Sequence, residues 1–178
     1  MLTPRQEPVV VTANGRIYAI GGASVDEALD SVESIGPGET AWRSEPPMPQ
    51  PMRQFAGCAL DGIVYVVSKA AALSFNPETG DWEALPPAPQ LPQASQIAAH
   101  DGEVWVLGSY NTDKGYRYSP VDRTWRPAPD LPSPNSWGAA AELDGRLIVA
   151  GGAHWEQYHF TFDDRMYALR PDWQRRGR

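Results

Sequence analysis

Residues 61–89 read DGIVYVVSKAAALSFNPETGDWEALPPAP, and this stretch decides the fold. It opens with the turn pair Asp61-Gly62, continues as an apolar run rich in β-branched and aromatic residues, and passes through an Asn-Pro turn to a strand led by Trp82. Prolines end that strand because proline cannot donate a hydrogen bond to a sheet. The pattern predicts a series of short strands joined by tight turns.

The same pattern occurs four times along the chain. Asn-Gly or Asp-Gly pairs, the strongest short-range signal of a β-hairpin, begin at positions 14, 61, 101 and 144. In-phase tryptophans follow at Trp42, Trp82, Trp125 and Trp173, and each of the first three precedes the next turn by 19 residues. The distance from turn to tryptophan varies between 21 and 29 residues. The length variation therefore lies in one segment of the repeat. This segment follows the position seven residues after each turn start, which is Gly21, Ser68, Gly108 or Gly151.

A repeat of 40 to 47 residues built from short strands indicates a propeller blade, since one such sheet cannot bury both its faces and must stack on further copies. The copies resemble kelch repeats, through NGRIYAIGG and PPMPQPMR in the first and LDGRLIVAGG and MYALRPDW in the fourth. The resemblance implies an all-β fold, a β-propeller of four kelch-like four-stranded blades forming one domain over residues 1–178. We expect the blades at about 7–45, 53–85, 95–128 and 137–174.

The number of blades leaves three arrangements open. Kelch-like propellers usually have six or seven blades, whereas this chain encodes four. The chain forms a closed four-bladed ring, or a partial propeller completed by oligomerisation, or part of a propeller whose remaining sequence is missing. The shortened turn before Trp173 and the RRGR ending favour assembly or truncation, so a homo-oligomer is among the expectations.

Composition narrows the class of partner. A net charge of −7 argues against nucleic acid, because phosphate binding needs clustered cations. The single cysteine, Cys58, lies in an apolar run and is expected to be a buried small hydrophobe. The first residues lack the uninterrupted apolar region of a signal peptide, and no run approaches a membrane span, so we expect a cytoplasmic protein without membrane contact.

Partner binding is expected on the face shared by the interblade connections and the loops after strand two, where kelch-like propellers commonly bind. The position eleven residues after each of the first three in-phase tryptophans is polar, and Trp137 and Trp155 fall out of phase with the packing tryptophans. The longest variable loop, AHWEQYHFTFDDR, contributes the rest. The predicted binding residues are Arg53, Gln93, Ser136, Trp137, His154, Trp155, Glu156 and Tyr158.

These residues favour a non-enzymatic protein-interaction module over an enzyme. A metal site at His154, Glu156 and His159 has suitable donor types but no recognised ligand spacing, so we predict no metal and no cofactor. The enzymatic alternative is a sugar-acting protein resembling sialic acid mutarotases (N-acetylneuraminate epimerase-like). There Arg53 would hold a carboxylate and Glu156 would move a proton. The partner is accordingly a protein or a small sugar.

Overall fold

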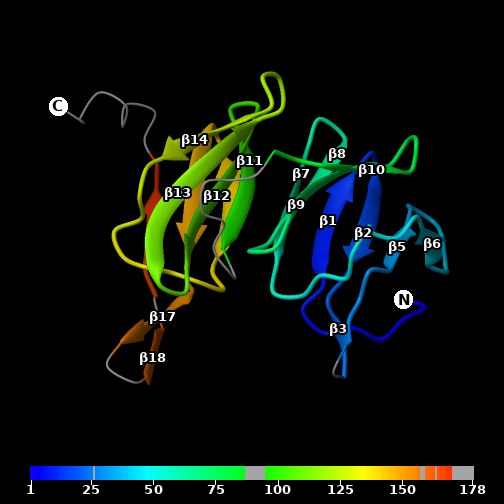
Figure 1. Ribbon diagram of the computed structural model, residues 1–178, viewed down its shortest axis with the longest axis horizontal. Helices are drawn as coiled ribbons and strands as arrows, with labels where there is room; N and C mark the ends of the chain where they lie inside the picture. The colour runs from blue at the N-terminus through cyan, green and yellow to red at the C-terminus, as the bar shows by residue number, and fades with distance from the viewer. Residues whose placement is uncertain (26, 87–94, 157–158, 163, 170–178) are drawn as a thin grey trace. The chain divides into compact units, whose positions relative to one another are not determined.

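The computed structural model describes residues 1–178 except 26, 87–94, 157–158, 163 and 170–178 (Figure 1). Within these described residues the regular structure is entirely β, which confirms the predicted fold class. No helix with the length and apolar character that a membrane crossing requires occurs in that part of the chain. The chain divides into two compact units, Met1–Pro87 and Ala88–Arg178, each with two blade-like sheets.

The first unit contains two four-stranded antiparallel sheets. The first sheet has the order β1-β2-β5-β6, with β1 (Val9–Ala13), β2 (Arg16–Ile20), β5 (Val32–Ile35) and β6 (Arg43–Glu45). The second comprises β7 (Ala56–Leu60), β8 (Ile63–Val67), β9 (Ala72–Asn76) and β10 (Asp81–Ala84). A short ribbon of β3 (Ala23–Ser24) and β4 (Glu27–Ala28) stands between β2 and β5.

The second unit repeats this plan. Its first sheet comprises β11 (Gln96–His100), β12 (Glu103–Ser109), β13 (Thr112–Ser119) and β14 (Thr124–Ala128). Its second has β15 (Ala139–Leu143), β16 (Arg146–Ala150) and β19 (Met166–Ala168), and the strand expected at Trp173 lies outside the described residues. The ribbon of β17 (Ala153–Glu156) and β18 (His159–Phe162) projects beyond the ends of the sheet strands (Figure 1).

The four turn pairs close the hairpins between the first two strands of each sheet. Asn14, Asp61, Asp101 and Asp144 have φ between 48° and 51°, and the glycine after each also has a positive φ. A two-residue hairpin turn needs positive φ at both positions, which Asn or Asp followed by Gly adopts at low cost. The turns therefore set the register of all four sheets, as the sequence pattern predicted.

Packing between sheets forms an apolar core in each unit. In the first unit Tyr18 and Ile20 on β2 pack with Val66 and Phe75, and Trp82 stacks on Phe75 with ring centroids 4.8 Å apart. Trp82 is a partly buried side chain packed against this core, and its indole Nε1 donates to the Pro46 carbonyl at 3.0 Å. In the second unit the core is built around Trp105.

Two segments that follow the second strand of a sheet contain short strands of their own, including the longest variable loop, AHWEQYHFTFDDR. The acidic segment after β2 contains β3 and β4, and the long segment after β16 contains β17 and β18. The equivalent segment of the first sheet of the second unit, residues 109–115, lies mostly within the β12–β13 hairpin. There the pairing of β12 with β13 shifts register between Leu107 and Ser109 and continues to the pair Ser109 and Thr112.

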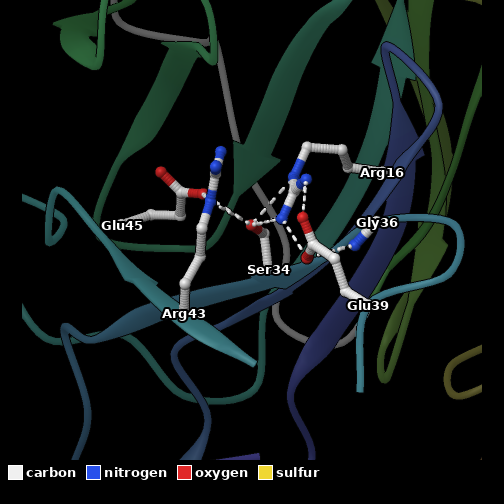
Figure 2. Close-up of polar contacts among 6 residues, drawn as sticks. All are labelled: Arg16, Ser34, Gly36, Glu39, Arg43 and Glu45. Carbon is white, nitrogen blue, oxygen red and sulfur yellow. Dashed lines mark hydrogen bonds and ion pairs between the residues drawn. The ribbon is translucent and has the colours of Figure 1, made fainter. Parts of the chain in front are cut away.

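A charged network joins β2, β5 and β6 of the first sheet (Figure 2). The Ser34 hydroxyl accepts hydrogen bonds from Arg16 and Arg43 and donates to Glu45 at 2.5 Å. Arg16 also makes two 2.7 Å bonds to Glu39, which lower the pKa of that carboxyl to about 2. Ser34 is fully buried, and each of these charges has a partner of opposite sign, so the network ties strands together and does not form a ligand site.

Candidate functional site

Four aromatic side chains of the second unit form an exposed group, here called the aromatic cluster: Tyr110, Trp137, Trp155 and Phe160. Tyr110 stacks on Trp155 with ring centroids 6.2 Å apart and meets Trp137 edge-on at 5.9 Å. Phe160 contacts all three other rings, at 4.8 Å from Trp155, 5.4 Å from Trp137 and 5.7 Å from Tyr110. Edge-to-face and offset contacts at these distances are favourable, so the rings hold one another in place.

The cluster remains open to solvent although its rings touch. Trp137, Trp155 and Phe160 are 51 %, 46 % and 38 % exposed. Aromatic rings are enriched at the centres of protein interfaces, because a rigid ring buries a large apolar area at a small cost in conformational entropy. This arrangement suits contact with a partner and supplies no acid, base or nucleophile.

Three segments distant in sequence supply the rings. Tyr110 lies at the tip of the β12–β13 hairpin, and Trp137 precedes β15. Trp155 and Phe160 are a cross-strand pair on β17 and β18. The base of this ribbon is fixed because Ser136 and Ala153 exchange two backbone hydrogen bonds of 2.8 Å, and the Ser136 hydroxyl donates to the Ala153 carbonyl at 2.9 Å.

A buried amide pair supports the same base. Asn135 Nδ2 donates to the Gly151 carbonyl at 2.9 Å, and Gln96 Nε2 donates to Asn135 Oδ1 at 3.1 Å. Gly152 follows with φ +109°, and a Cβ at this position would collide with the Asn135 side chain. Glycine at position 152 is thus required by the close approach of the segment that enters the last sheet.

The backbone of Trp137 is strained. Its φ is +56°, a left-handed conformation that is uncommon for a bulky residue and costs about 1–3 kcal/mol. Glu7 and Gln54, at the same place relative to the turns that follow them, have φ of 49° and 53°. The conformation belongs to the repeat, and in the last repeat it presents an indole ring.

The structure separates the predicted binding residues into groups. Trp137 and Trp155 meet in the aromatic cluster through Tyr110 and Phe160. Ser136 is fully buried and engaged with Ala153, and His154 is half-buried on β17. Arg53 is exposed in the first unit between β6 and β7.

The remaining predictions have less structural detail. Gln93 and Tyr158 lie outside the described residues. Glu156 is placed only as the backbone partner of His159 at the end of the ribbon. Among described side chains, no group of three His, Cys, Asp or Glu is placed to hold a metal ion.

Neither Cys58 nor Lys114 is in the protonation state that a nucleophile requires. Burial raises the pKa of the Cys58 thiol to about 12, so the thiol stays neutral and unreactive, as its apolar setting predicted. Lys114, near the cluster in sequence, bonds Asp130 at 2.5 Å and lies 3.7 Å from Asp113. The hydrogen bond that Lys114 donates to Asp130 is the main reason that the pKa of Lys114 is raised, which keeps the amine charged.

Sequence reasoning missed Tyr110 and Phe160. A signal for Phe160 was present, because AHWE and HFTF are two short segments separated by two residues, and HFTF alternates polar and apolar positions. This pattern is typical of a hairpin with aromatic residues on one face. Tyr110 carried no comparable signal, since its contacts depend on how segments 27 or more residues away pack beside it.

Comparison with known proteins agrees with the kelch-like repeat pattern and with the all-β fold. The Kelch motif family model matches residues 4–49. Mouse Kelch-like protein 35 is 29 % identical over 86 % of this chain and 29 % of its own length. Human Kelch-like protein 30 is 31 % identical over 99 % of this chain and 32 % of its own. Beta-scruin of Limulus polyphemus is 21 % identical over 86 % of this chain and 20 % of its own.

A solved structure, that of YjhT, superposes with a TM-score of 0.82 at 14 % identity and covers 94 % of this chain and 69 % of that one. The fold is thus a β-propeller of four kelch-like blades. The repeats, the sheets and the relatives together place the chain in the kelch-repeat family. The chain spans about a third or less of the length of the Kelch-like relatives that it matches.

Proposed function

We propose that this chain is a non-enzymatic protein-interaction module that binds a protein partner through the aromatic cluster. The observation that carries the proposal is four mutually packed rings, three of them more than a third exposed, supplied by an interblade segment and two connections after strand two. Membership of the kelch-repeat family supports an interaction role, and the Kelch-like relatives are much longer proteins than this chain.

Binding at this cluster follows from its physical character. Trp and Tyr are enriched among residues that dominate binding energy, and truncating such a residue commonly costs about 2 kcal/mol or more of binding free energy. The rings are pre-organised, because Phe160 contacts each of the others and the ribbon base is fixed by Ser136 and Ala153. Binding a partner therefore orders few side chains of this chain, so the entropy cost on this side of the interface is small.

The test is capture of proteins from a cell lysate by the immobilised chain, read by quantitative mass spectrometry. The double variant Trp137→Ala and Trp155→Ala removes two rings of the cluster. Val121→Ala is the matched control, since Val121 is almost fully exposed in the same unit at the β13–β14 turn. We expect a set of proteins captured equally by wild type and the control and lost from the double variant. Equal capture by all three chains would show that the cluster is not the binding surface.

A further inference from the structure

The ribbon of β17 and β18 has one strand edge that no described strand covers. Among the described residues, β17 and β18 form a two-stranded sheet of their own. The edge of β17 is held at its base, because Ala153 exchanges two 2.8 Å backbone hydrogen bonds with Ser136. No described segment pairs in this way with the outer edge of β18. This edge can therefore accept a further strand.

The register shows which backbone groups lie on that edge. Successive residues of an antiparallel strand direct their N–H and C=O groups to opposite sides of the strand. Ala153 directs both groups away from β18, toward Ser136, so Trp155 two residues later does the same. Their partners across the ribbon are Phe162 and Phe160. In such pairs neither residue bonds the other, so Phe160 and Phe162 direct their N–H and C=O groups to the outer edge of β18.

The side chains of the same two residues lie on the aromatic face of the ribbon. Residues paired across antiparallel strands lie on one face, and alternate residues along a strand share that face. Trp155, Phe160 and Phe162 therefore lie together, and the first two belong to the aromatic cluster. Phe162 is 82 % exposed. His154 and Thr161, the pair between them, lie on the opposite face and are half-buried.

The first unit shows that the uncovered edge is a property of the ribbon itself. There the segment that enters the next sheet is present, and its Met52 bonds Leu29 and Gly22 at the base of the β3–β4 ribbon. β3 and β4 still form a two-stranded sheet, and Ala28, the counterpart of Phe162 by register, is not part of that bridge. In the described part of the chain, a following sheet thus meets the base of the ribbon and leaves the edge beyond it uncovered.

We propose that the aromatic cluster binds its protein partner as an extended segment, which adds to the outer edge of β18 as an antiparallel strand. This inference rests on the proposed function and specifies the class of partner. Backbone N–H and C=O groups at strand spacing are matched by another extended backbone, whereas a helix satisfies most of its own groups internally. The added strand lies beside Phe160, so its side chains reach the cluster.

The register also predicts the sequence pattern of the partner. Partner residues opposite Phe160 and Phe162 place their side chains beside the aromatic face, where apolar groups lose the most contact with water. The residue between them lies opposite Thr161, on the face of His154, and favours a polar side chain. Both outer residues donate N–H groups to the ribbon, so neither is proline. The expected ligand is an extended apolar–polar–apolar segment.

A phage-displayed library of linear random peptides, selected on the immobilised chain, tests the proposal. We expect binders that share the apolar–polar–apolar pattern. In a synthetic binder, N-methylation at either apolar position removes a donor and should weaken binding about tenfold or more in fluorescence anisotropy. N-methylation at the polar position, whose N–H faces away from the ribbon, should leave binding nearly unchanged. A library without binders, or equal weakening at all three positions, overturns the proposal.

Phe162→Pro tests the edge from the side of the chain. Proline at this position removes the N–H that faces outward and leaves the hydrogen bonds between β17 and β18 in place. Phe162→Ala is the matched control, because it also removes the ring but keeps the N–H. The selected peptides should bind Phe162→Pro about tenfold more weakly than Phe162→Ala, with circular dichroism showing both chains folded. Equal affinity for the two folded chains contradicts strand addition.

The two proposals fail on different results. Trp137→Ala with Trp155→Ala removes rings and keeps the backbone edge of β18, so lysate capture that this double variant retains contradicts the proposed function. Lysate capture that is lost from the double variant but equal for Phe162→Pro and Phe162→Ala contradicts strand addition alone.

Discussion

The ribbons after the second strand of the first and last sheets occupy the same place in the repeat and carry different chemistry. β3 and β4 consist of Ala, Ser and Glu, whereas β17 and β18 carry Trp155, Phe160 and the exposed Phe162. Both ribbons are joined to the segment that enters the sheet, through the bridges Gln6 to Ala23 and Ser136 to Ala153.

The anchors of the two ribbons are also alike. Arg5 donates to the Gly21 carbonyl and Asn135 donates to the Gly151 carbonyl, each at 2.9 Å, and these positions are equivalent relative to the turn pairs. The repeat therefore builds a common base for the ribbon, and the variable residues at its tip decide what the ribbon binds. Stability and binding should respond to different substitutions.

The largest expected effect is at the anchor of the first ribbon. Arg5 and Glu33 form a buried ion pair at 2.5 Å, and Glu33 also accepts from the backbone of Leu2 and Thr3. Glu33→Ala leaves the Arg5 charge buried and unpaired and should cost about 3–5 kcal/mol of unfolding free energy. Urea denaturation followed by circular dichroism measures the loss.

The control for this change is Glu39→Ala, which removes a bidentate pair with Arg16 whose side chains are 39 % and 18 % exposed, more than those of Arg5 and Glu33 (Figure 2). Its urea midpoint should stay closer to wild type than that of Glu33→Ala, because a pair that is more open to solvent contributes less. If Glu33→Ala shifts the urea midpoint as little as Glu39→Ala does, the buried pair does not anchor the ribbon.

The second effect is at the anchor of the other ribbon. Asn135→Ala removes the donor to the Gly151 carbonyl and also the acceptor of the Gln96 amide. It should cost about 1–3 kcal/mol of unfolding free energy. Asn135→Asp keeps the acceptor and loses the donor, which tells whether the Gly151 bond matters. Thermal unfolding of the three chains measures both changes, and equal melting temperatures would remove this anchor from the comparison.

The third effect is a dependence of stability on pH. Burial raises the pKa of Glu33, but the hydrogen bonds from Leu2, Arg5 and Thr3 outweigh it, so its folded-state pKa lies below the unfolded value of about 4.3. The pair therefore contributes its full stability above the unfolded pKa and loses it as pH falls through the folded pKa. Melting temperature measured as pH decreases below about 4.3 should fall more steeply for wild type than for Glu33→Gln. Parallel curves would contradict the role of this carboxylate.

The smallest effect on stability is expected at the tip. Trp155→Ala removes a ring that is nearly half exposed and should shift unfolding free energy by about 0.5 kcal/mol or less, yet weaken partner capture. A loss comparable to that of Asn135→Ala would place Trp155 in the core of its unit. The same outcome would contradict the claim that the ribbon base determines stability and the ribbon tip determines binding.

Sequence predicted the sheets well because turn pairs and strand alternation are local signals. Asn14-Gly15 and its three equivalents fix hairpins within a few residues. The Arg5–Glu33 pair was not predictable, since it joins residues 28 apart whose meeting depends on how the entering segment crosses β5. Trp137 and Trp155 were selected because they depart from the repeat phase, while Tyr110 and the burial of Ser136 follow from packing that the spacing does not reveal.

The central claim is that binding belongs to the second ribbon and not to its equivalent. A photo-reactive phenylalanine analogue placed at Phe160 on β18, or at Ser24 on β3, tests this directly by cross-linking in lysate and mass spectrometry. We predict that the chain with the analogue at Phe160 cross-links the proteins that the wild-type chain captures and that the chain with the analogue at Ser24 does not. Cross-linking of those proteins from Ser24, or from neither site, would contradict the account.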